Sequence, residues 1–237
     1  MKNFNSLGFT LVMATASVMS SLSYAGAEDD PLLSYVAIDQ LEKGLESDDP
    51  ISFSFQAWVG YDMDKIWLKT SGEYQNSDDQ DLEVQALYSH AVAPYWDMQM
   101  GVRRDIKPSP SRDWLVLGFQ GLAPYFFDID GAFFVGEKGQ TSIRLSIEQE
   151  WLITQKLILT PEFEMNAYGK SDDELSMGAG LTDINAGLRL KYEITRKFAP
   201  YIGIDWSKKL GATADLARDN GDSISNSQFV IGVTAWF

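Results

Sequence analysis

Residues 51–60 read ISFSFQAWVG, and apolar and polar side chains alternate along this stretch. Ile51 and Phe53 would lie on one face of an extended chain, while Ser52 and Ser54 would lie on the other. Successive side chains of a β-strand point to opposite faces, so a period of two indicates a strand with one apolar and one wet face. The stretch therefore predicts a strand at the boundary between an apolar phase and water.

The same alternation recurs along the chain and predicts twelve strands, at residues 34–43, 51–60, 65–74, 82–91, 95–104, 112–121, 125–135, 140–152, 157–168, 181–194, 198–208 and 226–237. Alternate connections are short, at 61–64, 92–94, 122–124, 153–156 and 195–197. The others are longer and polar, at 44–50, 75–81, 105–111, 136–139, 169–180 and 209–225. Short turns at one end, longer loops at the other and an even strand number are typical of outer-membrane barrels. We therefore expect an all-β transmembrane antiparallel barrel of about twelve strands, with short periplasmic turns, rather than a soluble β-sandwich.

The first residues have the character of an export signal. Lys2 precedes a mostly apolar stretch at 7–19, and Ala25-Gly26-Ala27 offers a small-residue cleavage site. We predict a cleaved signal peptide at 1–27, an acidic periplasmic lead-in at 28–33 and the barrel at 34–237. The later sequence has no run of eighteen apolar residues, so no transmembrane helix is expected. Sec-type export to the outer membrane of a Gram-negative bacterium follows.

Composition excludes several functions. The chain has 237 residues, no cysteine, one histidine and a net charge of 19 − 34 = −15. Such an acidic chain lacks the clustered cations that bind nucleic acid, and it cannot build a thiolate site or one with two imidazoles. His90 is the one histidine, and Ser89 beside it would point to the other face, so a serine–histidine centre is not expected either. We therefore expect no enzyme activity.

Short motifs mark the ends of the predicted barrel. Ala93-Pro94-Tyr95, Ala123-Pro124-Tyr125 and Ala199-Pro200-Tyr201 are all placed on short turns. An aromatic girdle in contact with outer-membrane lipid is expected at that edge, formed by Tyr95, Trp96, Tyr125, Phe126, Trp151, Phe198 and Tyr201. The last strand ends at Phe237, which resembles the signal that the barrel assembly machinery reads.

Alternation sends many charged side chains into the lumen. Pairing across the short turns places an acid opposite an arginine three times, as Glu83 with Arg103, Arg144 with Glu164, and Arg189 with Asp205. Because buried charges need partners and a narrow barrel is filled by side chains, these pairs are interpreted as structural.

Five further acids fall on neighbouring strands, at Asp128, Asp130, Glu148, Glu150 and Glu162. Converging carboxylates in a confined space focus negative potential, so they could attract cations and are candidate metal ligands. A simply solvated wall is the alternative interpretation.

The segments that carry a family resemblance are WVGYD at 58–62, WLK at 67–69, GVR at 101–103, residues 108–114, GFQGLAPY at 118–125, LRLKYE at 188–193 and FAPYIG at 198–203. They resemble the copper resistance protein B family of the Gram-negative outer membrane. The resemblance covers residues 31–237. It implies a role in copper homeostasis, with copper as the ion bound or moved and a periplasmic multicopper oxidase as a working partner.

Members of that family often carry a Met- and His-rich stretch before the barrel, whereas residues 28–50 contain neither residue. Met63 in a short turn and His90 at the same rim are then the candidate soft-metal ligands. The expected function is an outer-membrane barrel that binds copper or passes it across the membrane. A narrow cation-favouring channel of other specificity and a purely structural barrel are the alternatives.

Overall fold

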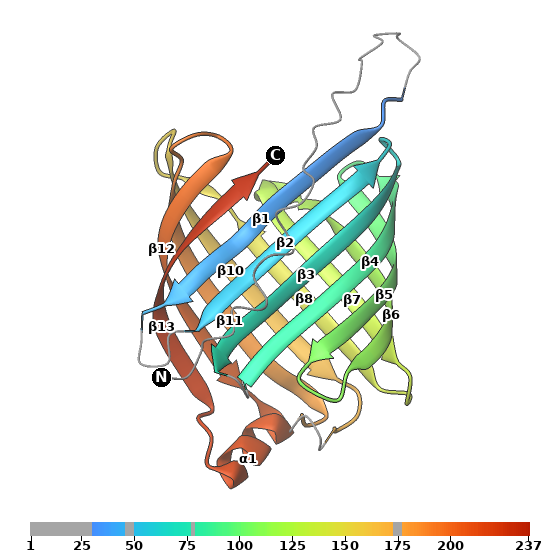
Figure 1. Ribbon diagram of the computed structural model, residues 1–237, viewed down its shortest axis with the longest axis vertical. Helices are drawn as coiled ribbons and strands as arrows, with labels where there is room; N and C mark the ends of the chain where they lie inside the picture. Colours follow the sequence, from blue (N-terminus) through green and yellow to red (C-terminus); the bar gives the residue numbers. More distant parts are fainter. Residues whose placement is uncertain (1–29, 46–49, 77–78, 173–176) are drawn as a thin grey trace, which may run out of the picture. The chain divides into compact units, whose positions relative to one another are not determined.

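The barrel is formed by one closed antiparallel sheet. The computed structural model of the protein describes residues 30–45, 50–76, 79–172 and 177–237, and Leu32–Phe237 form one compact unit. Each strand pairs with the next along the chain, except that β8 and β9 both pair with β10, and β1 pairs with β13 to close the wall (Figure 1). The strands are β1 (Leu33–Gly44), β2 (Ile51–Gly60), β3 (Asp64–Asn76), β4 (Asp79–Ala93), β5 (Trp96–Lys107), β6 (Arg112–Ala123), β7 (Phe127–Gly136), β8 (Thr141–Gln149), β9 (Trp151–Leu152), β10 (Leu157–Tyr168), β11 (Gly180–Tyr192), β12 (Phe198–Lys209) and β13 (Ser225–Trp236).

The segments β8 and β9 are two parts of one spanning strand. Both pair with β10 in the same register, with Glu148 opposite Glu162 and Trp151 opposite Leu159. The interruption falls at Glu150, between them. Over the described residues the wall therefore contains twelve antiparallel spanning strands, which confirms the predicted fold class.

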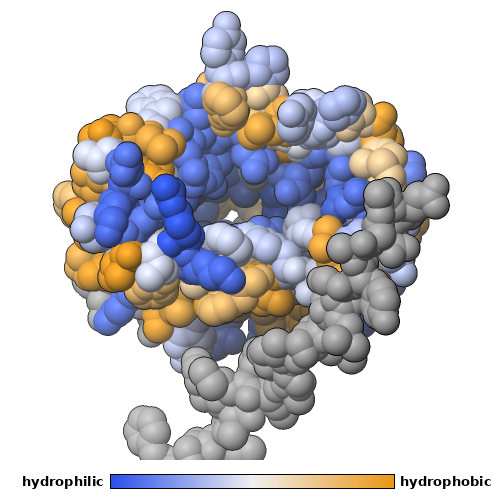
Figure 2. Space-filling view, turned by 90° about the horizontal axis from the view of Figure 1, so that it is seen from above, coloured by the Kyte–Doolittle hydropathy of each residue, from blue (hydrophilic) through white to orange (hydrophobic). Residues whose placement is uncertain are grey.

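The two faces of the wall differ in polarity, as the alternation predicts. In β6, Leu115 and Leu117 are 64% and 55% exposed, whereas Trp114 and Val116 are 3% and 2% exposed. The exposed apolar side chains form the outer face, and hydrophilic residues gather on the inner side of the ring (Figure 2). This arrangement suits a wall with lipid outside and a polar lumen inside.

Connections at the two ends of the barrel differ in length. At one end they are 61–63, 94–95, 124–126 and 153–156, together with 193–197. The longest connections, 169–179 and 210–224, lie at the other end. The prediction of a long loop at 75–81 was wrong, because β3 and β4 continue to Asn76 and Asp79 and leave only 77–78 between them. Backbone pairing therefore continues through most of the stretch predicted as a loop, with Tyr74 opposite Gln80 and Asn76 opposite Asp79.

A helix lies in the predicted loop 209–225. Helix α1 (Gly211–Asn220) follows β12, and Gly221, with φ 82°, ends it in the left-handed conformation that favours glycine. Ala214 and Ala217 are buried, and the buried Thr213 hydroxyl accepts a hydrogen bond from Gly178 N–H at 2.9 Å. Within the described part of the chain, no helix has the length and apolar character needed to cross a membrane.

The repeated Ala-Pro-Tyr motif occupies two kinds of position. Pro94 and Pro124 lie in short turns, where Tyr95 and Tyr125 adopt left-handed φ values of 69° and 67°. The prediction that Ala199-Pro200-Tyr201 forms a turn was wrong, because these residues lie inside β12. Proline is tolerated there because it stands close to the start of the strand. Tyr201 is 3% exposed, so it belongs to the lumen and not to an aromatic girdle.

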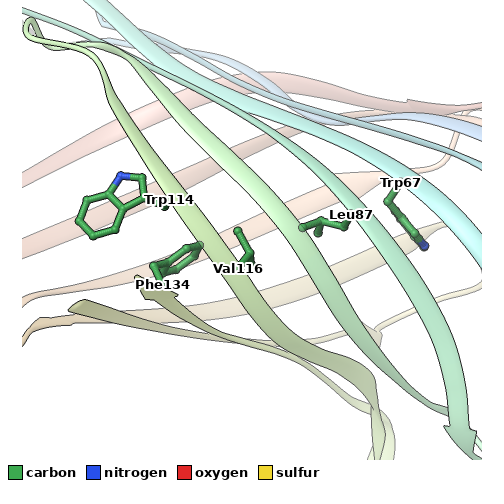
Figure 3. Packing of buried hydrophobic residues seen from close by; sticks show 5 residues of the cluster. All are labelled: Trp67, Leu87, Trp114, Val116 and Phe134. Carbon is green, nitrogen blue, oxygen red and sulfur yellow. The ribbon is translucent and has the colours of Figure 1, made fainter. Parts of the chain in front are cut away.

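A hydrophobic cluster lies on the inner face of the barrel. It consists of Trp67, Leu87, Trp114, Val116 and Phe134, from β3, β4, β6 and β7 (Figure 3). The ring of Phe134 faces two guanidinium groups, and its centroid lies 4.7 Å from Arg103 Cζ and 5.7 Å from Arg144 Cζ. Side chains, apolar as well as charged, therefore fill this side of the lumen.

Candidate functional site in the barrel lumen

The first lumen cluster centres on Glu83 and contains two arginines. Arg103 Nη2 lies 2.9 Å from Glu83 Oε2, and Arg103 Nε lies 2.6 Å from Asp105 Oδ1. Arg144 Nη1 and Nη2 lie 2.9 and 3.0 Å from the two oxygens of Glu83. Two guanidinium groups therefore share one carboxylate, and the predicted contact between Glu83 and Arg103 is present.

The register of this contact differs from the prediction. Arg103 stands opposite Gln85 in the ladder, and Glu83 stands opposite Asp105, so Arg103 reaches Glu83 diagonally. The predicted partner of Arg144, Glu164, lies at 4.0 Å from its Nε, and Asn166 faces Arg144 in the ladder. Arg144 instead extends from β8 to Glu83 on β4, four strands away around the wall.

The second lumen cluster gathers three carboxylates around one arginine. Arg189, 4% exposed, contacts Glu42 at 3.0 Å, Glu162 at 2.6 Å and Asp205 at 3.0 Å. The Tyr201 hydroxyl donates to Glu42 Oε2 at 3.1 Å. The predicted contact of Arg189 with Asp205 is present, again as a diagonal, since Gly203 faces Arg189 in the ladder. The cluster holds more negative than positive charge.

Sequence reasoning did not place Glu42 in the lumen. The pairing of β1 shifts by one residue between Ile38 and Leu41, which is a β-bulge. Before the bulge, Val36 is exposed at 50%; after it, Glu42 is 4% exposed and faces inward. Strict alternation would put both on the same face, so only the bulge brings Glu42 to Arg189. A bulge has no reliable sequence signal here.

Three of the five remaining acids have cationic partners. Lys69 Nζ lies 2.7 Å from Asp130, Lys191 Nζ lies 3.3 Å from Glu148, and Arg189 contacts Glu162. For Asp128 and Glu150, no ion-pair partner is found among the described residues. Asp128 stands opposite Glu148 in the ladder. The structure thus brings these acids onto one stretch of wall, but most of their charge is matched by cations of the lumen.

The rim candidates lie close together outside the lumen. His90 Nδ1 is 2.7 Å from Asp64 Oδ1, and the Tyr88 hydroxyl also donates to Asp64. The carbonyl oxygen of Met63 accepts from Ala91 N–H at 2.9 Å, and the Met63 side chain is half-exposed. Across the described ranges, no group of three or more His, Asp or Glu side chains has the geometry to hold a metal ion. The rim contains an aspartate–histidine pair and a nearby thioether, not a formed metal centre.

The fold defines the class of protein. The solved structure titled NanC porin superposes with a TM-score of 0.55 at 13% identity, and the match covers 86% of this chain and 99% of that one. At this identity the likeness concerns the fold alone. This is an outer-membrane β-barrel whose lumen is lined by charged and largely paired side chains.

Sequence comparison gives the family. The family model described as copper resistance protein B precursor (CopB) matches residues 32–237. Copper resistance protein B of Escherichia coli is 42% identical over 210 residues, which are 88% of this chain and 71% of that protein. The copper resistance protein B homolog of Pseudomonas syringae pv. tomato is 38% identical over 223 residues, 94% of this chain and 76% of that protein. The chain belongs to the copper resistance protein B family, as the motifs at 58–62 and 118–125 indicate.

Proposed function

We propose that this barrel serves copper homeostasis by letting copper ions enter and cross its lumen. The observation that carries the proposal is the Arg189 cluster, where three carboxylates surround one guanidinium group. Surplus negative charge in a narrow lumen with low-dielectric walls lowers the energy of a cation there. Family membership selects copper among the cations that such a lumen would accept.

The lumen donors favour the harder form of the metal. The inward-facing ligands are carboxylates, amides and hydroxyls, whereas Met98 and Met100 are exposed on the outer face at 54% and 55%. Oxygen donors suit hydrated divalent ions, and thioethers suit Cu(I). Copper would therefore pass through the lumen as Cu(II), and Met63 and His90 at the rim would be the candidate ligands for Cu(I).

Catalysis is not part of the proposal. Ser89 is fully buried and its hydroxyl donates to Asp97 at 3.1 Å, while His90 is directed to Asp64 on the other face. The serine and histidine therefore have separate partners. In the cell, the barrel assembly machinery would recognise the strand ending at Phe237, and a periplasmic multicopper oxidase would handle the ion on the inner side.

A narrow cation channel without preference for copper is the second candidate. It is favoured by the absence, from the described residues, of a clustered set of metal ligands. A deletion strain distinguishes the two, with survival and metal content measured under copper and under zinc. Copper specificity predicts a phenotype with copper only; equal phenotypes with both metals favour the general channel, and none with either favours a structural barrel.

A further inference from the structure

Lys69 places its ammonium group among three side-chain oxygens from strands beyond its neighbour in the wall. Its Nζ lies 2.7 Å from Asp130 Oδ2, 3.1 Å from Gln120 Oε1 and 3.3 Å from Gln99 Oε1. Lys69 is on β3, and the three acceptors are on β7, β6 and β5. The side chain therefore reaches beyond the adjacent strand β4 to three consecutive strands, whose oxygens converge on one positive charge.

The oxygens of this cradle, defined as those of Gln99, Gln120 and Asp130, are held in place. Gln99 is 4% exposed, and its Nε2 donates to Gln120 Oε1 at 3.2 Å. Because that amide nitrogen is used as a donor, the Gln99 oxygen is left to face Lys69. The Asp130 side chain is 40% exposed, so the cradle is accessible from the lumen on its carboxylate side.

The donor set matches a metal ion as well as an ammonium group. One carboxylate and two amide oxygens are ligands that hard divalent cations take, with water completing the coordination shell. Another lumen lysine, Lys191, has a different environment. Its Nζ lies 3.3 Å from Glu148, and no second hydrogen-bonding or ion-pair partner is found for it among the described residues. A three-oxygen arrangement is specific to Lys69 among these two lysines.

We propose that the cradle is a binding site for a hard divalent cation in the lumen, and that Lys69 is the resident cation which such an ion displaces. Asp39 and Asp128 also interact electrostatically with Lys69 and would receive its ammonium group when it leaves. Lys69 then acts as a gate, since it fills the site when no ion is present. The cradle would be one ion-binding site along the proposed route through the lumen. Its proposal rests on the proposed function only for the identity of the transported ion.

The test measures Mn²⁺ binding to the folded barrel purified in detergent, from the loss of the free-ion electron paramagnetic resonance signal. Lys69→Met removes the resident cation and should bind Mn²⁺ at least about 10-fold more tightly than the unaltered protein, a gain of about 1.4 kcal/mol. Adding Asp130→Asn to Lys69→Met should abolish that gain. Equal affinities of Lys69→Met and the unaltered protein, or a gain that survives Asp130→Asn, would overturn the proposal.

Lys191→Met is the matched control, because it removes the same charge from the same lumen. On its own it should give a much smaller gain in Mn²⁺ affinity than Lys69→Met, since Lys69 still fills the cradle; an equal gain would show a general effect of lumen charge and would overturn the proposal. Folding is checked by the heat-dependent mobility shift in gel electrophoresis, and Lys69→Gln replaces Lys69→Met if the latter does not fold. Failure of this test leaves the copper phenotype of a deletion strain unaffected, and the reverse also holds, so the two proposals fail separately.

Discussion

The two arginine clusters of the lumen use the same chemistry with different charge balance. In the Glu83 cluster, Arg103 and Arg144 share Glu83, and Asp105 pairs with Arg103. In the Arg189 cluster, one guanidinium group serves three carboxylates. The first is balanced and packs on Phe134. The second has surplus negative charge. Charge in the lumen of one barrel is therefore matched by counter-charge at one place and in surplus at another.

The largest effect is expected from Arg189→Met. It leaves Glu42, which is 4% exposed, and two neighbouring carboxylates without their shared counter-charge. Breaking a buried ion pair in this way costs about 3–5 kcal/mol of unfolding free energy. Urea unfolding of the detergent-purified barrel measures it. Arg196→Met is the control, because Arg196 has a 72% exposed side chain and should change stability by less than about 1 kcal/mol. Equal effects of the two substitutions would contradict the assigned burial.

A smaller loss is expected from Arg144→Met. Glu83 loses its bidentate partner but keeps Arg103 at 2.9 Å, so its charge remains compensated. We expect a loss of about 1.5–3 kcal/mol, which is the range for a hydrogen bond to a charged group. The same urea titration compares it with Arg189→Met. A loss as large as that of Arg189→Met would mean that the cross-lumen contact, rather than charge balance, decides the stability of the Glu83 cluster.

The smallest change in stability is expected from Glu162→Gln, because Arg189 retains Glu42 and Asp205. Unfolding free energy should stay within about 1 kcal/mol. Cation preference should nevertheless fall, since surplus charge is removed. The reversal potential of the barrel in a planar bilayer under a KCl gradient measures this preference. Asp113→Asn is the control, as Asp113 is paired with Arg104 in an exposed position. An unchanged reversal potential in Glu162→Gln would show that the Arg189 cluster does not act on passing ions.

Period-two alternation predicts the barrel because lipid and lumen impose opposite polarity on neighbouring residues. For that reason the faces of residues such as Leu115 and Trp114 follow from local sequence. The partner of Arg144 does not follow from local sequence. Glu83 contacts it across the closed lumen from a distant strand, and no local pattern encodes a contact between such strands. Glu42 was missed because a bulge reverses the alternation, and Tyr201 was misplaced because its motif also occurs in turns.

The ion-pair partners of the lumen acids could not be predicted from the sequence either. Asp130 and Glu148 can be assigned to the inner face from sequence, yet their partners Lys69 and Lys191 come from distant strands. Whether a carboxylate is available to an ion depends on such contacts, and these depend on the register of the whole wall. The predicted signal peptide at 1–27 lies outside the described residues, and export stays a prediction.

Entry of Cu²⁺ into liposomes that contain the purified barrel and an enclosed copper-quenched dye tests the central claim most directly. We expect faster quenching than in protein-free liposomes. Quenching should slow markedly when Asp130→Lys and Glu148→Lys reverse the charge of these two lumen residues, with each variant checked for folding. Quenching at the protein-free rate, or an unaltered rate after the double charge reversal, would contradict it.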